Sequence, residues 1–455
     1  MKTNFTPFLF ACLLFCARPV AGQVPVYSSY PGAQAVVYLD FDGHTVFNTA
    51  WNWNGPIYCG PSGISEAGIT EIYNRIAEDY RPFAINVTTD SSKFLAAPLT
   101  KRIRIIFTAS YEWYGTAGGV SMVGSFAWGD DTPAFVFSTL LGLDNRKIAE
   151  AGSHEAGHSL GLYHQVVYDA NCVQVAEYNP GTGSGEIAWA PIMGVGYYRN
   201  MTLWHNGPNY TGCSSTQDEL QTITVMNNIP FRPDDHPAEF NRATTLRISA
   251  NQFSSEGIIE KNDDSDLFKI SLRDDLRLSL AVVPFNLGQS NSGSNMDMEV
   301  KLYDRNRSLI RTYNPELFLD CVVDTFLSRG SYYISVEGAG NQYSPDYASL
   351  GAYTIQGNVT SASRENSTAK YNLSLPLSVP LSRPQLAGNV IQNELQVKSP
   401  GSFNYYISDM QGVVYAKGVL RSGLNQLRSL QLAPGLYIIS YDNGTERYSD
   451  KFLRQ

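Results

Sequence analysis

The chain has 455 residues, a formal net charge of -9 and a hydrophobic content of 43%. This length predicts about two to four domains, and this hydrophobic content argues against a disordered chain. An acidic balance without a stripe of Lys and Arg argues against nucleic acid and anionic membranes as partners. Tyrosine (28), phenylalanine (21) and glycine (38) are abundant, while only 16% of residues are charged. Such a balance is typical of β-rich extracellular modules.

Residues 1–22 have the layout of a secretory signal peptide. Lys2 precedes a short apolar run from Pro7 to Ala17, and small residues stand before the expected cut. The run is too short to span a bilayer. The alternative is a lipoprotein signal that ends at Cys12. No later segment reaches transmembrane length, so we expect a secreted or cell-surface protein without a transmembrane segment, with residues 23–34 as a short lead-in.

The pattern over residues 35–228 predicts one α/β domain of the size of a catalytic domain. Three stretches rich in β-branched and aromatic residues are expected to be strands: Ala35–Phe41, Ile103–Phe107 and Ala134–Phe137. Three stretches with helical spacing are expected to be helices: Ile69–Ile76 with Ser65 as a candidate N-cap, about Asn145–Leu160, and about Thr216–Asn227.

Beyond this domain the pattern changes to short alternating runs. Residues 229–237 carry three prolines together with acids and are expected to be a linker. Residues 238–360 predict a β-sandwich. A Ser/Pro-rich connector follows at 361–380, and residues 381–455 repeat the all-β pattern. The expected fold is therefore multidomain, an α/β (α+β) catalytic domain followed by two all-β sandwich modules. Strands of these modules are expected at Leu267–Ile270, Leu278–Val283, Val300–Tyr303, Tyr332–Val336 and Leu436–Ser440.

Four cysteines follow residue 22, and an even number in an exported chain permits disulfides. Cys172 and Cys213 bracket one irregular, Gly-rich stretch and are the expected disulfide pair. Cys59 and Cys321 lie far apart in the sequence and are candidates for free thiols. The alternative is that all four are inert buried thiols.

The stretch HEAGHSLGLYH, which begins at His154, holds three of the six histidines. His154 and His158 are four residues apart, so a helix places both on one face. Glu155 stands beside them and can take a proton from a metal-bound water. Gly161 allows the helix to end in a left-handed turn, after which the chain can return His164 as a third nitrogen ligand. Three protein ligands with one open position are typical of catalytic zinc.

This stretch is similar to the zinc signature of the metzincin metallopeptidases. The resemblance covers roughly residues 35–228, where AVVYLDFDG, DYRPFAINVTTD and GTAGGVSMVGSFAW resemble secreted bacterial, reprolysin-like members. It implies that Met193, in the turn-rich APIMG, is a hydrophobic floor beneath the histidines and not a ligand. Some members have a tyrosine two residues after this methionine, where this chain has Val195. For Tyr197 two alternatives therefore stay open: it supports the transition state, or it only packs against its neighbours.

The resemblance also implies a place for the substrate. In these peptidases the strand before the active-site helix borders the cleft and pairs with an extended peptide, and Ala134–Ser138 is the matching stretch. A role in latency is not expected for Cys59, because it lies inside the domain. Branches of the family differ after the third histidine. This chain has Gln165 there, neither the Asp of adamalysin-type members nor the Glu of astacins, so the branch stays open.

The two trailing modules resemble known domains as well. Asp234 to Gly357 is similar to the pre-peptidase C-terminal domain of secreted bacterial peptidases, through its DSDLF, MDM, GSYY and GAY stretches. About Leu381 to Gln455 is similar to the C-terminal sorting domain of the type IX secretion system, through DMQG, GLN, APGLY and the tail KFLR. The usual Tyr-Pro-Asn-Pro opening is missing, so the start of this module is open. The resemblance implies the type IX secretion machinery as a partner, with the tail removed or attached at the surface.

Acidic turns offer candidate calcium ligands in two places. Asp40 and Asp42 stand at the end of the first expected strand, and Asp263, Asp264 and Asp266 precede a strand of the first sandwich. Calcium is bound by such carboxylates, but solvated turn acids have the same sequence pattern.

Together the patterns predict a monomeric, secreted zinc endopeptidase that hydrolyses extracellular proteins. The zinc ligands would be His154, His158 and His164, and Glu155 would be the general base. Two alternatives stay open: a glycoprotein- or mucin-directed metallopeptidase, and a catalytically weak surface binding protein. The loops that shape a specificity pocket have no readable code, so the substrate is not predicted.

Overall fold

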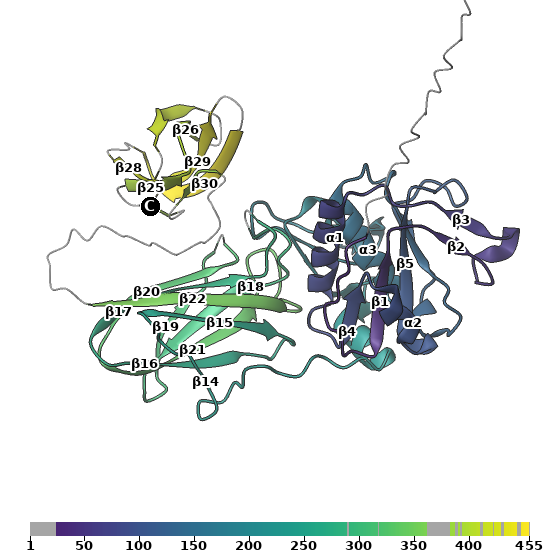
Figure 1. The fold of residues 1–455 in the computed structure, drawn as a ribbon, viewed down its shortest axis with the longest axis horizontal. Coiled ribbons are helices and arrows are strands. Elements are labelled where there is room, and N and C mark those ends of the chain that lie inside the picture. The colour runs from purple at the N-terminus through teal and green to yellow at the C-terminus, as the bar shows by residue number, and fades with distance from the viewer. Residues whose placement is uncertain are drawn as a thin grey trace, which may run out of the picture. The chain divides into compact units, whose positions relative to one another are not determined.

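The computed structural model describes residues 24–288, 291–316 and 318–361, and residues 383–454 with gaps at 387–389, 392–393, 410–412, 422, 429–431 and 444–446. The chain divides into two compact units, Met1–Ala362 and Ser363–Gln455 (Figure 1). The expected signal peptide and almost all of the expected Ser/Pro-rich connector lie outside the described residues. Among the described residues, no helix combines the length and the apolar character needed to cross a membrane.

The first unit begins with a five-stranded sheet in the order β4-β1-β5-β7-β6. Its strands are β1 (Ala35–Asp40), β4 (Ile85–Thr88), β5 (Arg102–Thr108), β6 (Gly119–Val120) and β7 (Ala134–Phe137). Strands β4, β1, β5 and β7 pair in parallel with their neighbours, and β6 pairs antiparallel with β7. The three strands expected from the sequence of this part are confirmed.

Helices cover both faces of this sheet, which is why β1 is buried throughout its length. Val37 and Leu39 belong to the same buried cluster as residues of α1 (Glu66–Asp79) and α3 (Asn145–Ser159). Val36 and Tyr38 point the other way and pack with Phe94 of α2 (Ser91–Ala96). The long helices α1 and α3 also pack against each other.

Both long helices begin where the sequence predicts. The Ser65 hydroxyl accepts a hydrogen bond from the Gly68 N–H at 3.2 Å, and the Asp144 carboxylate accepts one from the Lys147 N–H at 3.2 Å. These caps satisfy N–H groups that the helix itself leaves free. Helix α3, which carries the first two histidines, therefore has a fixed starting point.

The prediction of a third helix over about Thr216–Asn227 is mostly wrong. Thr216–Asp218 is strand β13, which pairs antiparallel with β12 (Asn206–Pro208). The Asp218 side chain then caps a short helix, α4 (Glu219–Gln221), by accepting from the Gln221 N–H at 2.9 Å. A π-helical turn follows at Thr222–Met226. Because Asp218 is a strong N-cap, the helix begins there and not at the start of the apolar pattern.

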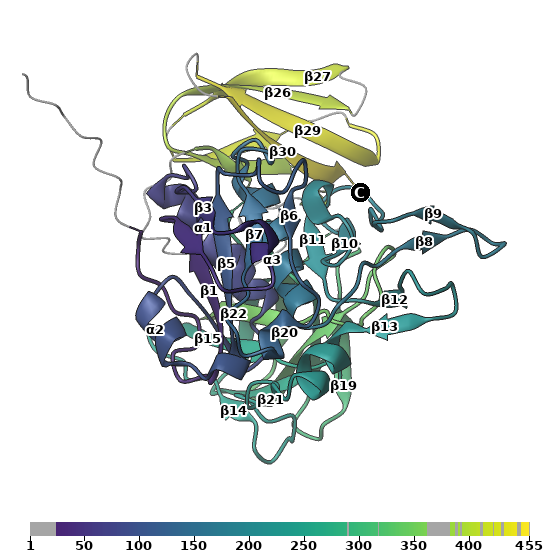
Figure 2. The same ribbon diagram turned by 90° about the vertical axis from the view of Figure 1, so that its right-hand side faces the viewer.

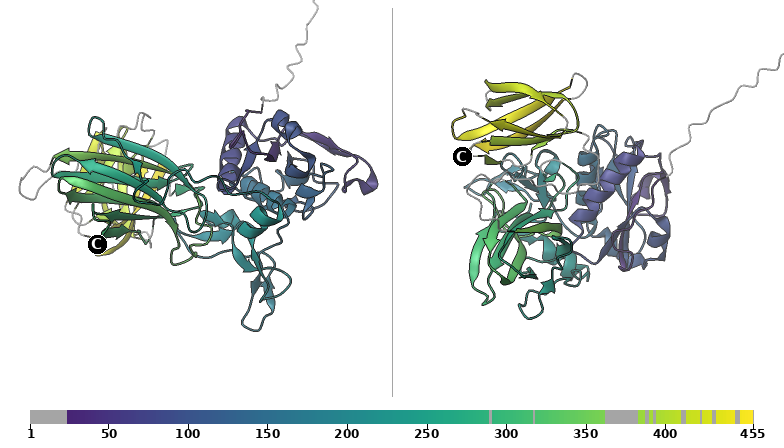
Figure 3. Two further views of the ribbon diagram at one scale, coloured as in Figure 1. Left: turned by 90° about the horizontal axis from the view of Figure 1, so that it is seen from below. Right: turned by 60° about the vertical axis from the view of Figure 1, so that its left-hand side comes forward.

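A β-sandwich of two sheets forms the rest of the first unit, with orders β14-β16-β21-β18-β19 and β15-β22-β17-β20. Its strands are drawn in teal to green in Figure 3. They are β14 (Thr244–Thr245), β15 (Gln252–Ile259), β16 (Asp266–Leu272), β17 (Leu276–Pro284), β18 (Asp297–Tyr303), β19 (Leu309–Tyr313), β20 (Cys321–Leu327), β21 (Gly330–Ala339) and β22 (Gly351–Ser361). The four strands expected here are confirmed.

The sandwich and the α/β part share one buried cluster and belong to one compact unit. The Asn295 amide donates to the Asp79 carboxylate at 2.6 Å, and the Ala352 N–H donates to the Glu78 carboxylate at 2.8 Å. The expected linker at 229–237 is packed in its first half, because the Ala84 N–H donates to the Pro230 carbonyl at 2.8 Å. The α/β part and the sandwich are thus joined by contacts as well as by sequence.

The second unit is all-β, as predicted, and its strands are drawn in yellow tones in Figure 2. One sheet has the order β23-β25-β28, and the other has the order β24-β30-β29-β26-β27. The strands are β23 (Gln385–Leu386), β24 (Val390–Ile391), β25 (Glu394–Ser399), β26 (Phe403–Asp409), β27 (Val414–Leu420), β28 (Gly423–Arg428), β29 (Gly435–Asp442) and β30 (Arg447–Arg454). The expected strand at Leu436–Ser440 lies within β29.

Candidate metal centre

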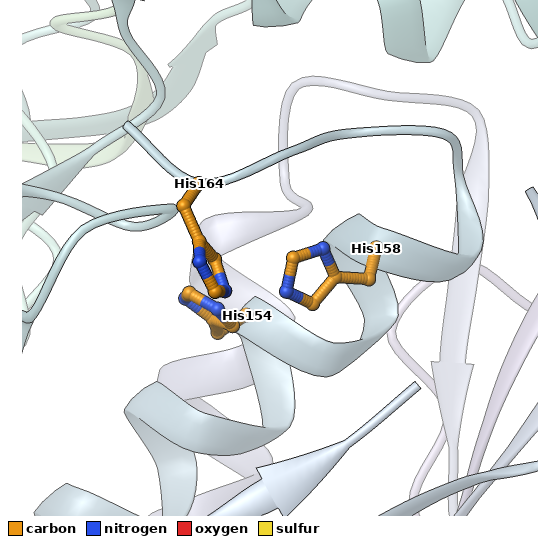
Figure 4. A group of neighbouring side chains, drawn as sticks. All are labelled: His154, His158 and His164. Atoms are coloured by element: carbon orange, nitrogen blue, oxygen red, sulfur yellow. The ribbon is translucent and has the colours of Figure 1, made fainter. Parts of the chain in front are cut away.

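Three histidine side chains meet at the C-terminal end of α3. His154 and His158 lie one helical turn apart, and the helix ends at Ser159. Gly161 then has a φ of 96°, in the left-handed region expected from the sequence, and the chain turns back toward the helix. Figure 4 shows the three rings converging, and a nitrogen atom of each histidine lies within 4.8 Å of the others.

The second ring nitrogen of each histidine faces an oxygen atom. Nδ1 of His154 lies 2.9 Å from the Ile192 carbonyl, and Nδ1 of His158 lies 2.7 Å from the Leu162 carbonyl. A carbonyl oxygen only accepts, so both Nδ1 atoms carry the hydrogen. Nδ1 of His164 lies 3.5 Å from the carboxylate of Glu177. This arrangement orients metal-binding histidines and leaves Nε2 as the ligand atom.

Burial keeps these histidines neutral, as ligation requires. It lowers the pKa of His154 well below its usual range, and the neighbouring histidines act in the same direction. The pKa of His158 falls to about 4, mainly through burial. Burial also lowers the pKa of His164. The lone pairs needed for a metal ion are therefore available near neutral pH, and the donor set fits Zn²⁺.

Met193 lies fully buried beneath the histidines. A Cβ at Gly157, between the first two histidines on α3, would lie 2.5 Å from the Met193 sulfur. The Met193 carbonyl accepts a hydrogen bond from the Gln165 N–H at 2.8 Å. Together with the bond from His154 to the neighbouring carbonyl of Ile192, this contact ties the methionine turn to both ends of the histidine motif.

Gln165, the residue after the third histidine, belongs to a buried network. Its amide donates to the Glu219 carboxylate at 2.8 Å, and that carboxylate also accepts from the His205 N–H at 2.7 Å. Burial raises the pKa of Glu219 to about 8. Gln165 thus anchors the chain that carries His164.

Glu155 is buried beside the histidines, and its Oε2 has no hydrogen-bond partner. Burial raises the pKa of this carboxyl well above its usual range. A Cβ at Gly119 of β6 would lie 2.7 Å from the Glu155 carboxylate, so the strand backbone passes directly over it. The residue expected to be the general base is therefore held against the edge of the sheet.

This contact corrects the expected substrate-binding strand. Ala134–Ser138 was expected to border the cleft, but the edge of β7 is covered by β6, in which Gly119 faces Val136 and Val120 faces Phe135. The terminal strand on this side is therefore β6. A two-residue strand with a glycine has no alternating side-chain pattern, so the sequence carried no signal for it.

A cleft of about 700 Å³ opens over the histidines. Its walls come from Tyr114 to Val123 around β6, from α3, from Gly194 to Tyr197, and from the segment that includes Gln174 and Tyr178. Tyr197 lines it, and a Cβ at Gly118 would lie 3.0 Å from the Tyr197 hydroxyl. Burial raises the pKa of Tyr197, and the charge of Glu155 adds to this effect.

Tyr178 is a cleft residue that the sequence did not reveal. Its ring centroid lies 4.3 Å from that of His164 and 6.1 Å from that of His154. Tyr178 and Glu177 stand in the irregular stretch after the hairpin of β8 (Val167–Tyr168) and β9 (Gln174–Ala176), which projects to the side in Figure 2. No spacing links these residues to the histidine motif, so only the fold brings them together.

The expected disulfide between Cys172 and Cys213 is confirmed, with a Cα–Cα distance of 5.5 Å. It joins the tip of the β8–β9 hairpin to the segment after β12. Cys59 and Cys321 are buried free thiols. Burial raises the pKa of Cys59 to about 12, and Cys59 is not among the residues that line the cleft.

The candidate calcium ligands are only partly brought together. The Asp40 carboxylate is engaged by the Arg104 guanidinium at 2.5 Å. Carboxylate oxygens of Asp234, Asp264 and Asp266 lie within 4.8 Å of one another, whereas Asp263 is not in this group. Asp234 was expected in the linker, and no sequence spacing pointed to it. Asp266 and the neighbouring Glu260 are buried, and each has one carboxylate oxygen without a hydrogen-bond partner.

No protein-family model and no curated protein matches the sequence. Among solved structures, the pre-peptidase C-terminal domain of a collagenase from Bacillus anthracis is 14% identical, with a TM-score of 0.19, over 28% of this chain and 100% of that one. The periplasmic lysozyme inhibitor PliG of Aeromonas hydrophila is 9% identical, with a TM-score of 0.19, over 26% of this chain and 96% of that one. A β-glucuronidase of Faecalibacterium prausnitzii is 11% identical, with a TM-score of 0.14, over 45% and 36%. At these values the likenesses are distant and identify no family, so function is argued from the site.

Proposed function

We propose that this protein is a secreted, zinc-dependent endopeptidase. The observation that carries the proposal is the histidine cluster next to Glu155. Three neutral histidines converge, two with Nδ1 bonded to a backbone carbonyl, and a carboxylate with one unpartnered oxygen stands in the same cleft. The resemblance of HEAGHSLGLYH to the metzincin zinc signature supports the same assignment.

His154, His158 and His164 would hold the ion, and three protein ligands leave a position open. A bound Zn²⁺ supplies Lewis-acid chemistry, which polarises a substrate carbonyl and makes water acidic enough to act as a nucleophile near neutral pH. The carbonyl of Ile192 would fix the orientation of His154, and Met193 would pack against α3 at Gly157, between His154 and His158.

Glu155 would move the protons of the reaction. Its free Oε2 can accept a proton from the attacking water and return it to the leaving amine. Burial raises the pKa of this carboxyl, which makes its carboxylate a stronger proton acceptor than an exposed glutamate. The hydroxyl groups of Tyr178 and Tyr197, which line the same cleft, are hydrogen-bond donors for charge that develops on the substrate oxygen.

An extended peptide would lie along β6. This strand ends the five-stranded sheet, and its backbone passes over Glu155. Addition of a peptide strand to such an edge supplies main-chain hydrogen bonds for any sequence. The role first expected for Ala134–Ser138 is thereby proposed for Gly119 and Val120.

Export and a second metal are separate parts of the proposal. The signal-like layout of residues 1–22 and the likeness of the last module to a sorting domain support export by type IX secretion machinery to the cell surface or medium. For the acidic group of Asp234, Asp264 and Asp266 we propose Ca²⁺, because buried carboxylate oxygens without partners stand there.

Hydrolysis of casein or gelatin by the purified protein tests the enzymatic function. We expect activity that is lost in Glu155→Gln and after chelation, and restored by added Zn²⁺. Glu112→Gln, an exposed glutamate outside the cleft lining, is the matched control and should stay active. Zinc binding without hydrolysis by the wild-type protein would favour the surface binding protein, and cleavage of mucin but not of peptides would favour the glycoprotein-directed enzyme.

A further inference from the structure

Two aromatic side chains in the cleft have no part in the proposed chemistry. Tyr163 and Tyr210 both line the cleft, and their ring centroids lie 5.0 Å apart with an interplanar angle of 69°. Both side chains stay accessible, with exposed fractions of 38% and 56%. The exposed side chain of Val123 lines the same cleft. Val123, Tyr163 and Tyr210 are named the aromatic corner below.

The backbone ties the aromatic corner to the histidine motif. Tyr163 directly precedes His164 in the chain. Gly124, which directly follows Val123, donates its N–H to the carbonyl of His158 at 2.9 Å. The corner is therefore anchored at the C-terminal end of α3, where the second and third histidines stand.

Hydrogen bonds also hold the two tyrosines in place. The side-chain amide of Gln217 accepts from the Tyr163 N–H at 2.9 Å and donates to the Tyr163 carbonyl at 2.9 Å. The Val166 N–H donates to the carbonyl of Pro208 at 3.0 Å, two residues before Tyr210. An aromatic surface that is already ordered loses little conformational entropy when a ligand binds to it.

The aromatic corner lies farther along the chain from the strand proposed to bind the peptide. Gly119 of β6 lies against Glu155, and Val123 follows four residues later. An extended chain advances about 3.3 Å per residue, so four residues span at most about 13 Å. A peptide that adds to β6 would therefore reach the corner with a side chain two to four residues from the scissile bond.

We propose that the aromatic corner is a specificity subsite, which binds an apolar or aromatic side chain of the substrate at such a position. The inference rests on the proposed peptidase function and names a class of its substrates. The three side chains carry no charge that could pair with a charged substrate side chain, and among the described residues that line the cleft there is no Lys or Arg. An apolar side chain is stabilised by burial against the rings, and an aromatic one gains edge-to-face contacts as well.

The test measures cleavage of peptides in which one position at a time holds Phe, Leu, Arg or Ala. We expect the wild-type kcat/KM to favour Phe over Ala by at least about tenfold at one position two to four residues from the scissile bond. Tyr210→Ala should remove most of this preference without loss of bound zinc, and Tyr210→Phe, which keeps the ring, should preserve it. Tyr58→Ala is the matched control, because Tyr58 is 74% exposed and does not line the cleft.

Binding to the inactive Glu155→Gln variant gives a second readout. The dissociation constant of the Phe peptide should rise when Tyr210→Ala is added, and that of the Ala peptide should not. An unchanged Phe preference in Tyr210→Ala, or a wild-type preference for Arg at this position, overturns the apolar subsite. A glycopeptide whose affinity falls in Tyr210→Ala, while that of the Phe peptide does not, overturns it as well and assigns the ring to a sugar. If the wild type cleaves no peptide, the proposed function fails, and the binding ratio alone decides whether Tyr210 selects an apolar side chain.

Discussion

Gly119→Ala is the substitution that tests most directly whether Glu155 works from the place it occupies. The new Cβ would lie 2.7 Å from two atoms of Glu155, Cγ and Oε1, and 2.7 Å from the carbonyl oxygen of Phe135. Unstrained carbon contacts are about 3.5 Å or longer, so something must move by about 0.8 Å. The Phe135 carbonyl belongs to a buried strand paired on both sides, so the Glu155 carboxylate or β6 itself has to shift.

The size of the effect follows from that shift. Overpacking of this kind costs about 1–3 kcal/mol of stability. A misplacement of a catalytic group by about 1 Å costs roughly 10²-fold in rate. We therefore expect Gly119→Ala to lower kcat/KM on a fluorogenic peptide by roughly 10²-fold. Its zinc content should match that of the wild type, because the atoms nearest to the new Cβ belong to Glu155 and Phe135 and not to a histidine.

Gly32→Ala is the control, since no atom lies within 4 Å of a Cβ at that position. The assay measures kcat/KM, zinc content by mass spectrometry and the midpoint of thermal unfolding for both variants. Full activity of Gly119→Ala with a normal zinc content would refute the view that the backbone of β6 positions Glu155. Loss of zinc in this variant would also refute it, because the defect would then lie in the metal ligands.

Three further predictions concern Met193, the disulfide between Cys172 and Cys213, and the acidic group at Asp266. Met193→Ala should lower the free energy of unfolding by about 2–5 kcal/mol and weaken zinc retention during dialysis. Met193→Leu should lower the free energy of unfolding by less than about 1.5 kcal/mol. Equal zinc retention in both variants would contradict a role of Met193 in packing beneath the histidines. Replacement of Cys172 and Cys213 by Ser should lower the free energy of unfolding by about 2–4 kcal/mol in urea titrations, and an unchanged midpoint would contradict a stabilising disulfide. Burial raises the pKa of Asp266 to about 9, so its folded form holds a proton more tightly than its unfolded form, and without calcium its contribution to stability should fall as pH rises from about 4 to about 9. Addition of about 1 mM Ca²⁺ should raise the unfolding midpoint at pH 8, and Asp266→Asn should remove that response; a response that survives in this variant would place the ion elsewhere.

The convergence of the three histidines could be predicted from sequence because most of the information is local. A spacing of four residues on a capped helix fixes His154 and His158, and Gly161 supplies the turn that returns His164. The spacing of apolar residues along α1 and along the buried strands is local information of the same kind. These are the parts of the fold that the structure reproduces with bounds close to those expected.

The parts that the sequence missed depend on pairing between distant segments. Strand β6 has only two residues and is held by hydrogen bonds with β7. Tyr178 lies within the segment that the Cys172–Cys213 disulfide closes, and the fold of this segment places it beside His164. The helix expected from Thr216 gave way to strand β13 because that stretch pairs with β12. No local pattern encodes such pairings, so the terminal strand β6 was not predicted.

Asp79 links the sandwich to the helix that carries His154 and His158. This buried carboxylate accepts from Asn295 of the sandwich and from the hydroxyl of Ser153, which directly precedes His154. The Asp79 carbonyl also accepts from the indole of Trp204 at 2.7 Å. Loss of Asn295 would leave a buried acceptor unpaired one contact away from His154, at a cost of about 1–3 kcal/mol. The sandwich thus helps to hold the helix that carries the histidines.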